Sequence, residues 1–332
     1  MRILIIKLGA LGDVIRTLPL AKALKREFKG CEINWVTKEN AASIVKRCKY
    51  VDKVYALPYN EKINYDRLYN FDIDKDATTL ATEINASVKK GFYSDNNYPL
   101  AFDMGGEYYL NTLFDDEIKK NNKKTYQEMM FESAGLKYNK ESIDINLTKE
   151  DINYSSDFVK KNNLKLGKII GIHIGSSPRW PSKSWHESKI IEFVTKVKQE
   201  GYDVLLFAGP DDVEKQKNII NSLNNKKIPI SKNDPDNSLT EFYSLMNICN
   251  YIVCSDSLAL HLALALKKKT IALFFCTSYN EIEGYGFLNK IVSPLLEKFF
   301  PERMNEYNEE LTKSIKPEQV LEAIKRFGEK ND

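Results

Sequence analysis

The sequence predicts an α/β protein with two domains, each built around a parallel sheet covered by helices. Short apolar runs alternate with helical stretches in the first half of the chain, and this alternation starts again near residue 168. Between the two series, residues 137–167 are rich in Lys, Asn, Asp and Ser and hold no long apolar run. Alternating strands and helices are typical of parallel sheets with right-handed crossovers. With 332 residues, the chain is long enough for two such domains.

The first half is predicted to open with a buried strand at residues 3–6, where four apolar residues follow one another. A helix is predicted from about 13 to 28. The remaining elements of this half are strands at 32–37 and 53–57, a helix at 41–47 and a fourth strand entered through 65–71. The polar stretches at 94–100 and 119–124 are expected to be surface loops and helix ends.

The second half is predicted to begin with a buried strand at 168–174 and an amphipathic helix at 183–199. The segment LALHLALAL has a strand-like period of two, but Ala and Leu are strong helix formers and no β-branched residue follows until Thr270. We therefore predict a buried helix at 258–267. The other expected elements are strands at 203–208, 227–230, 251–254 and 270–275, and helices ending near 223, at 239–246 and at 316–327.

Composition excludes several classes of protein. The formal net charge of +3 is too small for the broad positive field of a nucleic-acid binder. Five dispersed cysteines read as reduced thiols, and three histidines make a histidine-built zinc site improbable. No stretch approaches the ~20 apolar residues of a membrane span. The sequence therefore predicts a cytoplasmic globular protein.

Two glycines and a carboxylate follow the first strand, in the segment KLGALGD. Gly9 and Gly12 are three residues apart, a spacing that fits neither a P-loop nor the G-x-G-x-x-G of dinucleotide sites. Thr37 stands where a dinucleotide site would carry an acid. Asp13 has two compatible interpretations: an N-cap of the next helix, or a base that accepts a proton from a hydroxyl in a cleft.

The segment GIHIGSSPRWPSKSW combines hydroxyls, backbone N–H groups and cations after a strand. Ser176 and Ser177 stand near a helix start, where N–H groups and the helix dipole favour phosphate oxygens. Arg179 and Lys183 add two cations, which suit a diphosphate.

Three aromatic residues of this segment have structural interpretations beside functional ones. Trp180 and Trp185 are expected to pack between the domains. His173 is interpreted either as a satisfied buried histidine or as a residue of the site, and the sequence leaves both open.

Two further loops after strands carry polar side chains. In VCSDSLALHLA, the carboxylate of Asp256 suits sugar hydroxyls, beside Ser257; His261, one turn on, is either a buried histidine or a phosphate contact. In AGPDDVEK, Asp212 or Glu214 suits a ribose hydroxyl, although solvated acids at a helix start explain them almost as well.

These segments resemble the glycosyltransferase family (family 9) that includes the ADP-heptose:lipopolysaccharide heptosyltransferases. The resemblance is carried, in the family's order, by ILIIKLGALGDVIRTLP, HIGSSPRWPSKSW and SDSLALHLALALKKKTIALF. It covers most of the chain and is weakest between about residues 71 and 165. It implies the GT-B fold, in which two Rossmann-like domains face each other across a cleft, and a metal-independent transfer that inverts the anomeric centre.

The resemblance also implies roles for single residues. Asp13 matches the catalytic base, and Lys7 with the Gly9–Gly12 loop matches an acceptor-side or phosphate-side loop. On the donor side it implies diphosphate contacts for Ser176, Ser177, Ser257 and His261, a sugar contact for Asp256, and a phosphate-binding cation at Arg179, with Lys183 as its rival. Leu258 stands where the family commonly has Gly, so donor geometry is expected to differ.

The implied partners are a nucleotide-sugar donor and a saccharide or glycolipid acceptor, with heptose from ADP-heptose as the first expectation and no cofactor. Residues 1–160 are expected to bind the acceptor and 161–315 the nucleotide sugar, with the helix at 316–330 a candidate to pack back on the first domain. The expected location is the cytoplasm, with peripheral contact at the inner membrane face allowed. No nucleic-acid partner is expected.

Four alternatives stay open. The first is a transferase of the same fold that uses another nucleotide sugar or a protein acceptor. The second is a metal-dependent transferase, because Asp72–Asp74 has the D-x-D spacing that can hold a metal ion against a diphosphate. The third is a non-catalytic sugar-binding protein, and the fourth is a nucleotide-sugar epimerase.

Overall fold

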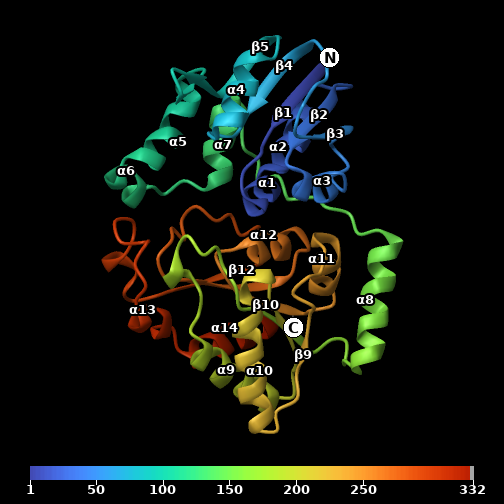
Figure 1. Cartoon of the computed structure of the whole chain (residues 1–332), viewed down its shortest axis with the longest axis vertical. Coiled ribbons are helices and arrows are strands. Elements are labelled where there is room, and N and C mark those ends of the chain that lie inside the picture. Colours follow the sequence, from blue (N-terminus) through green and yellow to red (C-terminus); the bar gives the residue numbers. More distant parts are fainter. Residues whose placement is uncertain (330–332) are drawn as a thin grey trace. The chain divides into compact units, whose positions relative to one another are not determined.

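The computed structural model describes residues 1–329 and divides into two compact units (Figure 1). Unit 1 comprises Met1–Asn146 together with Asn280–Glu283, and unit 2 comprises Leu147–Tyr279 and the chain from Gly284 onward. Each unit holds one six-stranded sheet with helices packed on it. The predicted α/β class with two sheets is confirmed.

The sheet of unit 1 has the strand order β3-β2-β1-β4-β5-β6. Strands β1 to β5 run parallel, and β6 pairs antiparallel with β5. The register places Ile5 of β1 beside Trp35 on one side and Tyr69 on the other. The strands are β1 Arg2–Ile6, β2 Glu32–Thr37, β3 Lys53–Ala56, β4 Tyr65–Asn70, β5 Ala86–Asp95 and β6 Tyr98–Ala101.

Helices cover this sheet because its central strands are apolar on both faces. Leu4 and Ile6 of β1 pack in one cluster with Ala77 and Ala81 of α4. The single helix predicted at 13–28 is two helices, because Pro19 lacks the N–H needed inside a helix and instead starts a new one. The helices are α1 Leu11–Thr17, α2 Pro19–Glu27, α3 Glu39–Val45, α4 Lys75–Glu83, α5 Met104–Phe114, α6 Asp116–Asn121 and α7 Tyr126–Ala134.

The sheet of unit 2 has the order β12-β11-β10-β7-β8-β9, and all its pairings are parallel. Its central strand β7 lies between β8 and β10. The strands are β7 Ile169–His173, β8 Asp203–Phe207, β9 Ser231–Lys232, β10 Tyr251–Ser255, β11 Lys269–Phe274 and β12 Leu288–Val292. The predicted strand at 227–230 lies just before β9.

Helices α9, α10 and α14 contribute to one apolar core with the strands of unit 2, while α11 packs against α12. LALHLALAL is helical over α12, and every residue from Ala259 to Ala265 is buried, as predicted. The helices are α8 Lys149–Asn162, α9 Glu187–Gln199, α10 Val213–Asn225, α11 Leu239–Asn247, α12 Leu258–Ala265, α13 Glu309–Lys313 and α14 Pro317–Glu329, with short 3₁₀ turns η1 Pro181–Lys183, η2 Pro210–Asp212 and η3 Leu296–Lys298. Among the described residues, no helix combines the length and apolarity needed to cross a bilayer.

The division between the units differs from the expected 1–160 and 161–315. Helix α8 packs against α11, and Asn237 donates a hydrogen bond to the Tyr154 hydroxyl at 2.8 Å. Residues 147–160, expected in the first domain, therefore belong to unit 2. The polar composition of 137–167 concealed this helix, because α8 exposes most of its surface.

The carboxyl-terminal helix also differs from its expected place on the first domain. Helix α14 contacts α9, β11 and β12, and Lys325 pairs with Glu200 at 2.9 Å. Val320 and Ile324 are fully buried in the core of unit 2. The apolar face of α14 is thus covered within unit 2; residue 330, the end of the predicted helix, lies outside the described residues.

Trp185 is a further correction. Its ring is 3% exposed and packs on Phe193 in the core of unit 2, and its Nε1–H donates to the carbonyl of Ile315 at 3.1 Å. The expected packing between domains is therefore wrong for this residue. Its partners come from α9 and from the segment before α14, which only the tertiary fold brings together.

Candidate functional site

Each sheet has a topological switch point. The strands that come next in the chain are added on one side of the first strand, and the later strands are added on its other side. This point lies between β1 and β4 in unit 1 and between β7 and β10 in unit 2. Ligands of open parallel sheets bind beyond the carboxyl ends of the strands at such points. The residues that follow β1, β4, β7 and β10 are therefore the candidates for a functional site.

Asp13 lies in the first turn of α1, directly after the loop that leaves β1. The N-cap of α1 is Ala10, and no side chain caps this helix end. The N-cap interpretation of Asp13 is therefore wrong. Its carboxylate instead pairs with Arg16, one turn on, with Oδ1 2.8 Å from Nη2. The Asp13 carboxylate therefore places a negative charge at the switch point of unit 1.

Lys7 is an interior cation of the same loop. It is 4% exposed, its Nζ donates to the carbonyl of Phe71 at 2.7 Å, and it lies 3.4 Å from Asp72 Oδ2. Burial works to lower the pKa of Lys7, but Tyr126, Asp72 and Asp13 raise it above its ordinary value. Lys7 is thus charged and fixed within unit 1.

Asp72 is a residue that sequence reasoning considered only as part of a metal motif. Its Oδ2 accepts hydrogen bonds from the N–H groups of Leu8 at 2.9 Å and Gly9 at 2.6 Å, and its Oδ1 accepts from Asp74 at 3.1 Å. Burial works to raise the pKa of Asp72, but Lys7 and these N–H groups lower it. Both oxygens of Asp72 are engaged by Lys7 and by backbone N–H groups. The structure therefore favours a role for Asp72 in shaping the loop over a role as a metal ligand. Its position after β4, next to β1, was the signal that could have found it.

Gly9 and Gly12 serve different purposes. A Cβ at Gly9 would lie 3.1 Å from Asp72 Oδ2 and 3.6 Å from both Asp13 Oδ2 and Lys7 Nζ. Glycine therefore leaves the space between two carboxylates and an ammonium unfilled. Gly12 is the second residue of α1.

Arg16 and Tyr126 complete the unit 1 cluster, and sequence reasoning missed both. The Arg16 guanidinium carbon lies 3.7 Å from the centre of the Tyr126 ring, which belongs to α7. The Tyr126 hydroxyl lies 2.8 Å from Thr17 Oγ1. No sequence spacing signals this contact, because α7 reaches α1 only through the tertiary fold.

In unit 2, Gly175 follows β7 and Asp212 follows β8, and the two residues touch. A Cβ on Gly175 would collide with the Asp212 carboxylate. Burial raises the pKa of Asp212, against the opposing charge of Lys215. Lys215 donates to the carbonyl oxygens of Ile174 at 2.8 Å and Trp185 at 3.2 Å. Glu214, the other predicted acid, is exposed.

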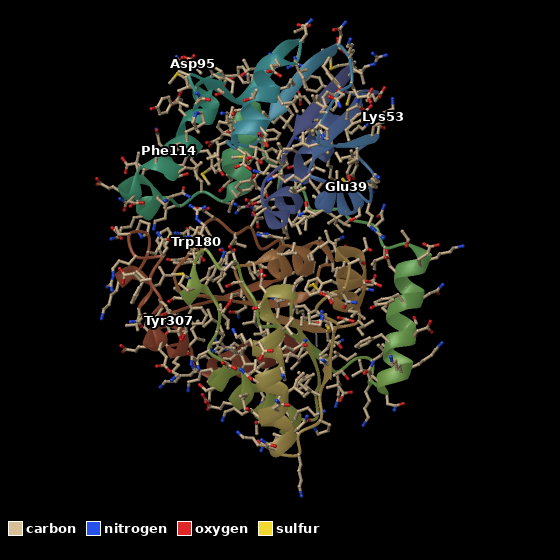
Figure 2. The ribbon with its side chains drawn as sticks, viewed as in Figure 1. Glu39, Lys53, Asp95, Phe114, Trp180 and Tyr307 are labelled. Atoms are coloured by element: carbon tan, nitrogen blue, oxygen red, sulfur yellow. The ribbon has the colours of Figure 1, made fainter. Side chains whose placement is uncertain are left out.

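The β7 loop separates its two predicted cations. Lys183 is 7% exposed, and its Nζ lies 3.2 Å from Asp256 Oδ2 and 4.8 Å from the centre of the Trp180 ring. Arg179 is exposed, with its guanidinium 5.2 Å from the same ring. Figure 2 marks Trp180 on this loop. Lys183 is therefore the cation that the fold joins to the β10 loop.

The two predicted serines, Ser176 and Ser177, form hydrogen bonds within the β7 loop. The Ser176 hydroxyl lies 2.7 Å from that of Ser184, and Ser177 Oγ accepts from the Arg179 N–H at 3.4 Å. Ser177 is exposed.

The β10 loop carries Asp256 and Ser257. Ser257 is the N-cap of α12, but its side chain does not cap the helix; its Oγ lies 3.4 Å from His173 Nδ1. Leu258 is the first residue of α12, and His261, one turn on, is 6% exposed. Burial, with the charge of Lys215, lowers the pKa of His173 to about 4, so this ring is neutral at neutral pH.

Three of the contacts described above join residues at or after the ends of β7, β8 and β10, and four of the predicted donor-side residues take part in them. Gly175 joins Asp212, His173 joins Ser257, and Lys183 joins Asp256. Glu214 and Arg179 stay at the surface. Within the described residues, no three His, Cys, Asp or Glu side chains form a group that could hold a metal ion.

The sequence is similar to those of known glycosyltransferases. A model of glycosyltransferase family 9 (heptosyltransferase) matches residues 61–311. "Lipopolysaccharide heptosyltransferase 1" of Campylobacter coli is 25% identical over 99% of this chain and 100% of its own length.

Solved structures share the fold. A glycosyl transferase family 9 protein of Veillonella parvula superposes with a TM-score of 0.77 at 18% identity, covering 98% of this chain and 96% of that one. E. coli heptosyltransferase WaaC, solved with ADP, gives a TM-score of 0.63 at 18% identity and covers 99% of both chains. The two sheets described above are the two Rossmann-like domains of a GT-B fold.

Proposed function

The chain belongs to glycosyltransferase family 9 (heptosyltransferase), and from that membership we propose that it transfers heptose from ADP-heptose to a hydroxyl of a lipopolysaccharide core saccharide. Its class, glycosyltransferase, follows from the family; the donor, the acceptor and the stereochemistry are the proposal. The name of the Campylobacter coli relative supports the acceptor, and the E. coli enzyme solved with ADP supports the nucleotide. We further propose that the transfer inverts the anomeric centre without a metal.

Unit 2 provides the donor site in this proposal. Lys183 offers an ammonium for diphosphate oxygens, and Asp256 beside it offers a carboxylate for a sugar hydroxyl. We assign the main diphosphate contact to Lys183, because it is buried at the strand ends whereas Arg179 is exposed. Ser176, Ser177, Ser257 and His261 add donors around the same edge. Asp212 is the candidate for the ribose.

Unit 1 provides the acceptor site and the base. The acceptor oxygen attacks C1 of the heptose and forms the new C1–O bond. The bond from C1 to the diphosphate oxygen breaks on the opposite side, and ADP leaves with the electron pair. Asp13 takes the proton of the acceptor hydroxyl, and fixed cations and N–H groups stabilise the charge that develops on the diphosphate.

The observation that carries this proposal is the ion pair between Asp256 and the buried Lys183 at the switch point of the second sheet. The pair holds a cation where a diphosphate would arrive. The metal-dependent alternative loses support, because Asp72 binds Lys7 and three backbone N–H groups instead.

Nucleotide binding and turnover test the proposal. ADP is expected to raise the melting temperature more than GDP or UDP at equal concentration, since a ligand of the native state stabilises it by RT ln(1 + [L]/Kd). ADP-heptose mixed with a heptose-free core saccharide is expected to release ADP at a rate that excess EDTA leaves unchanged, and NMR of the product should show the inverted anomer.

Two variants connect this test to the site. Lys183→Gln is expected to weaken ADP binding. Lys198→Gln is the control: Lys198 also lies 3.2 Å from an aspartate of unit 2, Asp203, and its loss should leave ADP binding unchanged. Preference for another nucleotide, or an unaltered ADP affinity in Lys183→Gln, contradicts the proposal.

A further inference from the structure

The ion pair of Asp13 is supported from a second helix. The Arg16 side chain is 14% exposed, and its guanidinium carbon lies over the Tyr126 ring, 3.7 Å from its centre. Tyr126 is itself held in three ways: its hydroxyl lies 2.8 Å from Thr17 Oγ1, its N–H donates to the Glu281 carbonyl at 2.9 Å, and its ring meets the edge of Tyr109. All these residues belong to unit 1.

A second ion pair of the same spacing in unit 1 is more exposed. Lys119 and Asp116 are also three residues apart on a helix of unit 1, at 3.3 Å. Their side chains are 23% and 54% exposed, against 14% and 35% for Arg16 and Asp13, and no aromatic ring of the described residues lies over Lys119. Exposed pairs of this kind contribute little to stability, because water and salt screen them. An Arg placed between a carboxylate and an aromatic face loses far less conformational freedom when it pairs, because its plane is already fixed.

Resting on the proposed role of Asp13 as the base, we propose that Arg16 is a positioning residue, clamped by Tyr126, that holds the Asp13 carboxylate in its reactive orientation and keeps it ionised. It does so without touching the reacting atoms. Misplacement of a reacting group by about 1 Å can slow a reaction ~10²-fold. The rate is therefore expected to depend on Arg16, because its ion pair helps to orient the base.

The charges around Asp13 make Arg16 its principal cation. Among the described groups, Lys7 from the end of β1, Arg16 on its own helix and Tyr109 from α5 interact with Asp13, and Asp72 from the β4 loop lies beside the same space at Gly9. Tyr126 and Glu281 act on Arg16. Lys7 is already paired with Asp72. Burial works to lower the pKa of Arg16, but Asp13, Tyr126 and Tyr109 raise it, so the guanidinium stays charged across the working pH range.

The test compares Arg16→Gln with Asp13→Asn and with the double variant. Arg16→Gln is expected to lower kcat about 10- to 100-fold while the Kd of ADP stays unchanged. The acid limb of kcat/KM should move to higher pH, because Asp13 loses the charge that favours its ionised form. In the Asp13→Asn background, Arg16→Gln should lower kcat little further, since both substitutions disable the same Asp13–Arg16 pair.

Two controls separate positioning from stability. Arg16→Lys retains the charge and should restore most of the pH profile but only part of kcat, because a lysine has no plane to stack on Tyr126. Lys119→Gln removes the matched exposed pair and should change neither quantity.

Two outcomes overturn the inference in different ways. If Arg16→Gln and Asp13→Asn lower the rate independently and the pH profile does not move, Arg16 has only a structural role. If Asp13→Asn alone turns over near the normal rate, the proposed function of Asp13 fails, and the role of Arg16 fails with it.

Discussion

In the proposed reaction, two side chains act from positions that follow β1 and β7. Asp13 follows β1 and Lys183 follows β7, and each is paired with a side chain of opposite charge, Arg16 or Asp256. The positions of Asp13 and Asp256 soon after apolar strands could be read from the sequence, but the sequence left Arg179 and Lys183 as alternatives for the cation. Arg16 could not be found in this way, since its role depends on a ring from α7 that no local pattern points to.

His173 gives a pH prediction. Its pKa falls from an ordinary value of about 6.5 to about 4 in the folded protein, through burial and the charge of Lys215. Between these pH values the unfolded chain binds a proton that the native ring does not, so the free energy of unfolding decreases as pH falls through this window. Urea unfolding of the wild type and of His173→Gln at several pH values is expected to show a shallower decrease in the variant. Equal slopes would contradict the assignment.

Helices and strands differ in how far their sequences reveal them. Helix α12 could be predicted from propensity despite its alternating pattern, because its Ala and Leu residues bury on every side. The β5–β6 hairpin could not: the polar stretch at 94–100 reads as a loop, yet it contains the end of β5, a tight turn and the start of β6. Asn96 and Asn97 both take positive φ, at 48° and 64°, as a two-residue hairpin turn demands.

The turn after β7 gives a prediction about backbone space. Gly175→Ala is expected to destabilise unit 2 by about 1–3 kcal/mol, because its methyl group meets the Asp212 carboxylate, and to weaken ADP binding as the loop shifts. Gly209→Ala is the matched control, since a Cβ there would lie 4.0 Å from the same carboxylate, an ordinary contact. Thermal melts and ADP titrations of both variants provide the comparison. Equal losses in both would show that the collision does not matter.

The two units repeat one plan with different chemistry. Each sheet reverses its strand order beside its first strand, and each places charged side chains at that point. The two-sheet organisation could be predicted because the alternation of strand and helix restarts along the chain. The membership of single elements could not: α14 joins unit 2 through buried apolar residues, whereas the buried residues of α8 are the polar Asp151 and Ser155. The segment Asn280–Glu283 returns to unit 1 from the second half of the chain. Tertiary contacts decide these memberships, and no local sequence pattern signals them.

The central claim is that one unit removes the acceptor proton while the other holds the donor. It is tested most directly by Asp13→Asn, with kcat and the dissociation constant of ADP measured on the same preparation. The account predicts that kcat falls ~10²–10⁴-fold, the range typical of a lost general base, while ADP binds with unchanged affinity. Near-normal turnover, or a loss of ADP binding that matches the loss of rate, would contradict it.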